Sequence, residues 1–490
     1  MKSLLRPILC GGILTALLCT PSLAAEPGDF TLLVNGEPVT FTDAAPVLKD
    51  GRSFLPMAAT FEALGFPADQ ITWDGEARTV TAVKPDVTYT SFQGTEKQGN
   101  LTVKLAIGSN TFSVQYEGNT TAGPHGDQVQ VVEDYTADAA PYIDAATSRT
   151  YIPVGLVADA LGYRVGWDGT TSTVIIDDVD AILAENTETY ELMDQYLDYA
   201  RKYSQGNYQL AGSYLLTSAP AQMESGVEMI NTVGGDYSMI SNQTAMQFDM
   251  GISIGGTIMG APISPTDMDL DMRADLDTGM LYLYFQSEDL NWLLSNVEIN
   301  GEKSDVQIPD QWYSLDMKAV YDEAYGPGVY EELIALNAAS ASEDMTFAQS
   351  LEDILDSDML PLTSGLTTKD YLEAFNLLLG DSSFQKSGST YTSTLEQDGA
   401  TVRFTLYSSA GKINGYGMEM TAADAATGGE MTMTMELKGE DMTFLFEMSG
   451  MTMEMDGTYQ AASAAPETEP PAGAKVVDLW ELLTTPISEL

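Results

Sequence analysis

One pattern occurs twice in the first third of this 490-residue chain. The first copy, GRSFLPMAATFEALGF followed by WDGEARTVTAV, lies within residues 51–83, and the second, SRTYIPVGLVADALGYRVGWDGTTSTVIIDD, spans residues 148–178. Each copy indicates a strand, a proline, a short helix that ends at Leu-Gly, and a strand, turn and strand that begin near Trp-Asp-Gly. This duplicated unit restricts the fold of the region more than any other stretch does.

Local signals support each step of that pattern. Asn35-Gly36 supplies the positive φ angles that a tight hairpin turn requires. Pro56 suits the first turn of a helix, where its missing N–H costs no hydrogen bond. Gly65 is placed to end that helix in a left-handed conformation, and Leu161-Gly162 closes the helix of the second copy in the same way.

These residues closely resemble the copper amine oxidase N-terminal domain family, often described as a stalk domain of exported bacterial proteins. The resemblance rests on Arg52 to Pro56 and Arg149 to Pro153, on the Ala-Leu-Gly helix ends and on the Trp-Asp-Gly turns, and it covers about residues 30–180. It implies two stalk-like modules, residues 26–95 and 96–180, each a small antiparallel sheet wrapped on one helix.

The family's domain carries neither the copper nor the quinone of the oxidase, and we expect no cofactor here. The single histidine, His125, cannot make a three-histidine copper site, and its Gly-Pro-His-Gly context indicates an exposed loop. The family usually has an arginine shortly after the proline, where this chain has Ala58-Ala59 and Gly155-Leu156. We therefore do not expect this chain to make the charged contact that an arginine at that position would make.

The tryptophans of the two turns, Trp73 and Trp167, have two interpretations. Large aromatic side chains dominate small cores, so we expect both to pack under the sheets. The alternative is that they stack on carbohydrate.

The first residues indicate export. Residues 1–25 form a predicted signal peptide, with Lys2 and Arg6 before an apolar run and small residues at its end. No later stretch approaches the roughly 20 apolar residues of a transmembrane helix. Both cysteines, Cys10 and Cys19, lie inside the signal, so the mature chain has no disulfide. We predict a secreted or extracytoplasmic protein associated with the cell envelope.

The charge is extreme, with a formal net charge of −51. Nucleic acid is excluded as a partner, because phosphate binding requires a basic surface. The acidic residues either form a solvated surface or recruit cations such as calcium. An EF-hand loop starting at Asp267 fails, because Met272 and Thr278 stand where the loop needs Gly and Glu.

The sequence pattern after the two modules predicts one β-rich domain, residues 184–460. It begins with a helix from Ala184 to Tyr203 and contains a helical insert over residues 318–380, whose last helix starts at a capping box formed by Thr367 and Asp370. The predicted strands are Tyr208 to Leu216, Met223 to Val233, Thr244 to Ile254, Thr266 to Asp277, Met280 to Gln286, Gln311 to Met317, Thr390 to Leu395, Ala400 to Ser408, Gly415 to Ala422, Glu430 to Leu437, Asp441 to Met448 and Met451 to Tyr459. The fold class is therefore α+β, with a large antiparallel sheet after the two modules.

Methionines alternate with polar residues along this predicted sheet, which gives it one apolar and one acidic face. The candidate ligand-binding residues are Met431, Met433, Met435, Met451, Met453 and Met455. Three interpretations stay open: packing against the helices of residues 184–203 and 318–380, an adaptable trough for a lipid or other apolar ligand, and a thioether copper(I) site completed across strands. The element order resembles lipoprotein-carrier folds of the cell envelope by pattern alone.

Residues 461–475 form a predicted Pro/Ala/Glu linker, followed by an amphipathic tail, residues 476–490, that could be a short helix. No catalytic or metal-binding constellation is found, because the mature chain lacks cysteine and has one histidine. We therefore predict a non-catalytic envelope protein whose stalk modules present a β-domain for structural or interaction roles with cell-wall or envelope components. The alternative is a carrier for an apolar small molecule, and an uncharacterised hydrolase ranks third.

Overall fold

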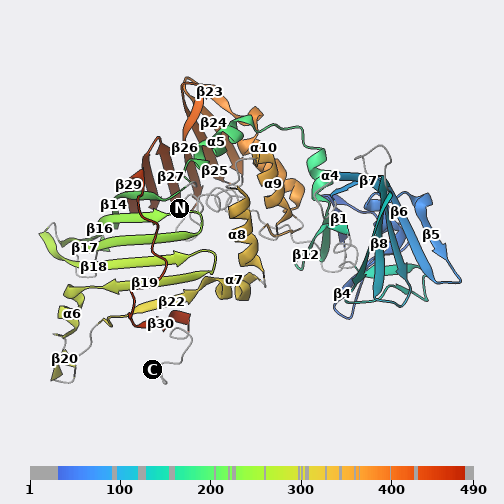
Figure 1. The fold of residues 1–490 in the computed structure, drawn as a ribbon, viewed down its shortest axis with the longest axis horizontal. Coiled ribbons are helices and arrows are strands. Elements are labelled where there is room, and N and C mark those ends of the chain that lie inside the picture. The colour runs from blue at the N-terminus through green and yellow to red at the C-terminus, as the bar shows by residue number, and fades with distance from the viewer. Residues whose placement is uncertain are drawn as a thin grey trace. The chain divides into compact units, whose positions relative to one another are not determined.

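The structure is a computed structural model. It describes residues 31–90, 96–119, 128–153, 161–203, 206–218, 221–222, 228–258, 261–295, 298–299, 302–303, 308–325, 328–340, 345–357, 360–363, 365–397, 399–423 and 429–480. The predicted signal peptide and His125 lie outside these residues. The described chain forms two compact units (Figure 1). The N-terminal unit holds the residues up to Asn186 together with Leu360–Leu372, and the C-terminal unit holds Thr187–Met359 and Glu373 onward.

Within the described residues, the N-terminal unit contains three sheets and short helices; most of the helix predicted in the second copy falls on residues 154–160, which lie outside them. The helical elements are α2 (Met57–Ala63), η1 (Ala68–Gln70) and α4 (Val179–Ala184). The first sheet has the order β12 (Arg164–Asp168), β13 (Thr173–Asp177), β1 (Thr31–Val34) and β2 (Glu37–Pro38). The second has the order β10 (Tyr142–Ile143), β11 (Thr150–Pro153), β4 (Arg52–Pro56) and β3 (Val47–Lys49). The third follows chain order: β5 (Ile71–Asp74), β6 (Thr79–Thr90), β7 (Glu96–Ala106), β8 (Thr111–Asn119) and β9 (Gln128–Thr136).

The two copies of the repeat share these sheets. Strand β4 of the first copy pairs antiparallel with β11, its equivalent in the second, so that Leu55 lies opposite Ile152. Strand β1 pairs parallel with β13, and β6 pairs with β7 across the boundary predicted at residue 95. Both copies also contribute to one hydrophobic core. The repeat therefore folds as one unit, in which strands of each copy complete the sheets of the other.

The predicted turn chemistry is confirmed. Asn35 and Gly36 have φ angles of 51° and 76° between β1 and β2, as a primed hairpin turn requires. Gly65 and Gly162 have φ angles of 83° and 68°, a region that a side chain disfavours. The helix of the first copy buries Phe61 in the core of the unit.

The prediction that Trp73 and Trp167 pack in the core is wrong. Their side chains are 47% and 46% exposed. Each indole lies beside the glycine of its own turn, and the Asp between them accepts hydrogen bonds from the turn: Asp74 from the N–H of Glu76 at 2.9 Å, Asp168 from the N–H of Thr170 at 2.9 Å. The Trp-Asp-Gly motif is thus a turn motif.

Residues 360–372 join the N-terminal unit through two buried charged residues. The Arg164 guanidinium donates to the carbonyl oxygen of Leu360 at 2.6 Å, and the Asp177 carboxylate accepts from the N–H of Thr368 at 2.8 Å. Thr368 begins α10 (Thr368–Leu379), which has the predicted capping box: the Thr367 N–H donates to the Asp370 carboxylate at 2.8 Å.

The C-terminal unit is built on one large sheet that contains the predicted strands. Most of their ends shift by a few residues, but the strand predicted to end at Val233 continues to Ser241, and its predicted start, residues 223–227, lies outside the described part. The sheet has the order β23 (Gln385–Ser387), β24 (Thr390–Gln397), β25 (Ala400–Ser409), β26 (Lys412–Ala423), β27 (Glu430–Lys438), β28 (Asp441–Met448), β29 (Met451–Ala461), β14 (Tyr208–Ser218), β16 (Glu228–Ser241), β17 (Ala245–Ile258), β18 (Ala261–Asp275), β19 (Met280–Gln286), β22 (Trp312–Asp316) and β30 (Val476–Asp478), with β15 (Ala221–Gln222) beside β16. Its neighbours are antiparallel except β22 and β30.

The helices of this unit are α5 (Glu191–Arg201), α6 (Glu288–Ser295), α7 (Met317–Tyr325), α8 (Val329–Ser340), α9 (Phe347–Asp356), the C-terminal part of α10 and the short η2 (Asp381–Ser383); a small hairpin, β20 (Glu298–Ile299) and β21 (Glu302–Lys303), follows α6. Helix α5 packs on β26, and its Tyr196 ring meets Tyr416 of that strand and Phe404 of the neighbouring β25 edge to face. The predicted linker, residues 461–475, crosses the sheet from β29 to β22 as a strap (Figure 1). The predicted helical tail starts with a strand instead, because β30 pairs with β22; residues 481–490 lie outside the described part.

Candidate functional site

The strand register aligns the apolar side chains of the C-terminal sheet into one continuous face. Met433 lies opposite Phe446, Phe446 opposite Met453, and Met453 opposite Leu216. The row continues across the sheet to Val233 and Ile254. Because side chains alternate along each strand, the polar residues between these positions face the other side.

Burial along this face changes from one end of the strands to the other. Near the turn at Gly439, the side chains of Leu437 and Tyr459 are 1% and 4% exposed. Helix α5 and the residues after it cover this end, where the Tyr199 and Tyr203 hydroxyls donate to the Gly439 carbonyl at 2.9 and 2.6 Å. Figure 1 shows α7 and α8 at the same end of the strands, while the opposite ends of β16 to β18 extend beyond them.

The six predicted binding residues differ in burial according to their place along the strands. Met435 is buried, at 6% exposure, whereas the other predicted methionines are half-buried: Met431, Met433, Met451, Met453 and Met455. Two half-buried phenylalanines, Phe444 and Phe446, stand between them on β28. The structure thus brings all six methionines to one apolar patch, of which the helices bury one edge.

A cavity of about 220 Å³ continues the same face where α7 and α8 meet the sheet. Four methionines from three strands and a helix line it, together with the buried ring of Tyr330: Met246, Met272, Met280 and Met317. The Tyr330 hydroxyl donates to the Leu276 carbonyl at 2.7 Å, and burial raises its pKa to about 12. Sequence reasoning missed this cavity, because only the fold of α7 and α8 over Met272 encloses it.

The size of the cavity favours an organic group over a metal ion. A volume of about 220 Å³ is several times the roughly 30 Å³ that one water occupies in the liquid. A thioether copper(I) site would need sulfur atoms that contact one small ion. An unbranched apolar group fits a methionine-lined space of this size better, since thioethers adapt to irregular shapes.

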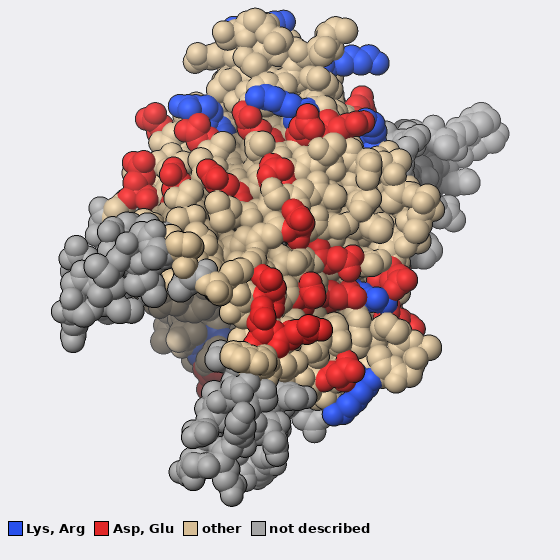
Figure 2. Space-filling view, turned by 90° about the vertical axis from the view of Figure 1, so that its left-hand side faces the viewer, with Lys and Arg blue, Asp and Glu red and all other residues tan. Residues whose placement is uncertain are grey.

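The opposite face of the sheet is acidic. Asp249 and Asp271 lie directly across from each other on β17 and β18, and burial together with the Asp271 charge raises the pKa of Asp249. Figure 2, which views the molecule from the left-hand side of Figure 1, shows more carboxylates than lysines and arginines on that side. Within the described ranges, no group of three or more His, Cys, Asp or Glu side chains could hold a metal ion.

The comparisons identify the N-terminal unit. The sequence model of the copper amine oxidase N-terminal domain matches residues 33–176 and, in a second overlapping match, residues 127–195. The chain thus carries this domain, as its motifs predicted, and the first match starts and ends in the paired strands β1 and β13. A comparison with curated proteins finds no match. None of the described helices is long and apolar enough to cross a membrane.

Proposed function

We propose that this protein is a non-catalytic, extracytoplasmic binding protein that holds a lipid or another apolar molecule on the methionine-rich face of its C-terminal sheet. The observation that carries the proposal is the half-buried apolar patch around Met433, Phe446 and Met453, beyond the end that the helices cover. A contiguous apolar surface that stays partly accessible to solvent commonly marks a binding site.

The composition of the patch supports an adaptable apolar ligand. Flexible, polarizable methionine side chains repack around different shapes, which suits surfaces that bind more than one molecule. The cavity beside Tyr330 lies on the same face and could hold one end of an extended chain. The N-terminal unit serves as a scaffold in this proposal, since its domain family is typical of exported proteins.

A structural or interaction role with envelope components remains the second candidate. The domain family favours it, because the family's members are described as stalks. It differs from the binding proposal in one respect that can be measured: a scaffold needs no apolar ligand. The two candidates therefore separate in a single set of experiments.

The test uses the full mature chain, because residues 360–372 belong to the N-terminal unit and a fragment of the C-terminal region would lose their support. We expect lipid to co-purify with the protein in mass spectra of organic extracts, and we expect the protein to take up an apolar fluorescent probe. The double variant Met433→Asp/Met453→Asp should abolish uptake while keeping the β-sheet circular dichroism signal. If those two charges unfold the C-terminal unit instead, the methionines are packing residues.

A matched control lies on the same two strands. Thr434 and Thr452 are half-buried and face the acidic side of the sheet. The double variant Thr434→Asp/Thr452→Asp adds the same charge and should take up probe like the unmodified chain. Absence of both co-purified lipid and probe uptake in the unmodified protein would leave the scaffold role as the explanation.

A further inference from the structure

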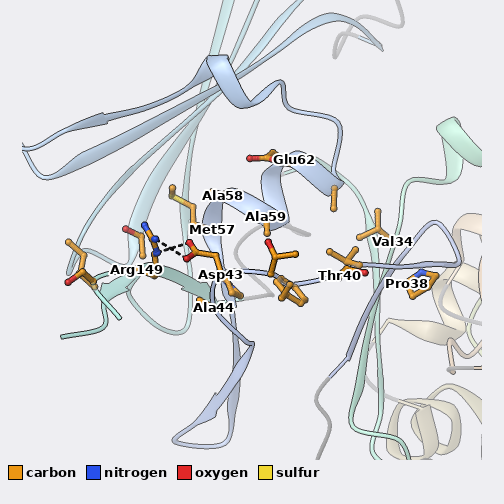
Figure 3. A pocket seen from close by; sticks show the side chains of 18 of the residues that line it. Val34, Pro38, Thr40, Asp43, Ala44, Met57, Ala58, Ala59, Glu62 and Arg149 are labelled. Atoms are coloured by element: carbon orange, nitrogen blue, oxygen red, sulfur yellow. Dashed lines mark hydrogen bonds and ion pairs between the residues drawn. The ribbon is translucent and has the colours of Figure 1, made fainter. Parts of the chain in front are cut away.

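An open groove of about 790 Å³ lies in the N-terminal unit. Helix α2, the segment from Pro38 to Ala44 and the strand region around Arg149 form its walls (Figure 3). Ala58 and Ala59 lie on the helix side of the groove, between Arg149 at one end and Val34 at the other. Such a volume lies in the range of roughly 300–1,000 Å³ that small-molecule sites occupy.

The positive and negative charges in and beside the groove nearly cancel, so the groove favours an uncharged ligand. Three carboxylates line it, but Asp43 forms a two-contact ion pair with Arg149, at 2.8 and 2.6 Å, and Glu37 pairs with Lys369 at 2.6 Å. Both partners of the Asp43–Arg149 pair are more than half exposed, at 62% and 53% of their side-chain surface. Their remaining donors and acceptors can therefore reach a bound molecule.

The other lining groups match the surface of a sugar. Thr40, Thr42, Ser148 and Thr150 add hydroxyl groups that both donate and accept hydrogen bonds. Trp73 adds an indole that is 47% exposed. A pyranose ring has an apolar C–H face that fits an aromatic face and a rim of hydroxyls that fits carboxylate and guanidinium groups.

We infer that this groove binds a neutral oligosaccharide, with the Trp73 indole as the stacking platform and the Asp43–Arg149 pair as the hydrogen-bonding group. The site lies in the N-terminal unit and is independent of the apolar site proposed for the C-terminal sheet. It gives the scaffold unit a glycan-anchoring role of its own. Ala58 and Ala59, whose side chains end at Cβ, leave the helix side of the groove open.

Calorimetric titration of the full mature chain tests this inference. The two probes are a β-1,4-linked N-acetylglucosamine tetramer, which represents cell-wall glycan, and a β-1,4-linked glucose tetramer, which represents other polysaccharides. Binding of either probe supports the site and identifies its source of glycan. We expect Trp73→Ala to weaken binding about tenfold, which corresponds to about 1.4 kcal/mol, because the variant removes the aromatic surface on which the sugar ring would stack.

Two further variants separate the site from its surroundings. Ala59→Arg places a long side chain in the groove at a helical position that tolerates arginine, so it should abolish binding without unfolding the unit. Trp167→Ala removes the equivalent tryptophan of the second copy, which is 46% exposed in the same turn geometry but does not line the groove. It should bind like the unmodified chain. The inference is overturned if neither tetramer binds, if Ala59→Arg binds normally, or if Trp167→Ala loses as much affinity as Trp73→Ala.

Discussion

The two units bury their apolar residues to different degrees. In the N-terminal unit, Leu32, Leu55 and Ile152 are inaccessible to solvent, because strands from both copies of the repeat enclose them. In the C-terminal unit, Met433 and Met453 hold equally central positions in a larger sheet and stay half-buried. The difference shows that sheet size alone does not complete a core: each apolar face needs a second layer. The helices of the C-terminal unit supply that layer over one end of the strands.

The units are alike in how they hold distant chain segments. Arg164 and Asp177 bind residues 360–372 in the N-terminal unit. In the C-terminal unit, the Arg273 guanidinium pairs with Asp271 at 3.1 Å, donates to the Glu469 carbonyl at 2.7 Å and holds the strap. Each case places a nearly buried charge where a segment without a core of its own must be fixed. Hydrogen bonds from a desolvated charge are stronger than those of exposed side chains.

The largest expected effect tests the difference in burial. Leu55→Ala should lower the free energy of unfolding of the N-terminal unit by about 3–5 kcal/mol, because it leaves a cavity in a closed core. Met433→Ala should cost the C-terminal unit less than about 2 kcal/mol, since its side chain is only half-buried. Denaturant titrations with hydrogen exchange on each unit measure both values. Leu48→Ala, at a side chain that is 60% exposed, is the control. Equal losses for Leu55→Ala and Met433→Ala would mean that the methionine face is a closed core.

Sequence reasoning predicted local structure better than long-range pairing. Alternation along Glu430–Lys438 and Asp441–Met448 places both strands correctly, because one face of each is apolar and the other polar. The pairing of β1 with β13 could not be predicted, since it joins residues 142 positions apart in sequence and no periodic pattern records it. The six methionines were predicted to share a face, but their exposure depends on where α5, α7 and α8 end. The Pro/Ala/Glu composition of residues 461–475 predicts a linker, because nothing in that segment indicates that Arg273, on a distant strand, fixes it to the sheet.

A smaller effect concerns the pH dependence of the N-terminal unit. Burial raises the pKa of Asp177 against the lowering influence of Thr368 and Arg164, so folding shifts this carboxyl toward its protonated form relative to the unfolded chain. A carboxyl whose folded pKa is raised contributes most stability below its unfolded pKa of about 3.9 and loses that contribution as pH rises through the folded pKa. The stability of the unmodified unit minus that of Asp177→Asn should therefore fall as pH rises from about 3.5. Unfolding free energies over pH 3.5–7 measure this difference. A difference that grows with pH would show that the Arg164 charge dominates.

The smallest expected effect tests the strap. The Glu467 carboxylate pairs with Arg273 at 2.5 Å but is 63% exposed, so Glu467→Gln should cost less than about 1 kcal/mol in global stability. Its local effect should be larger in relative terms, because the strap has few other anchors: hydrogen exchange of amides between residues 462 and 478 should speed up several-fold. Glu469→Gln is the matched control, since Arg273 contacts the main-chain carbonyl of that residue and the substitution keeps it. Equal exchange rates in the two variants would mean that the pairing of β30 with β22, and not Arg273, holds the strap in place. Selective loosening in Glu467→Gln would show that the ion pair with Arg273 holds the strap in place, much as Arg164 holds residues 360–372 in the N-terminal unit.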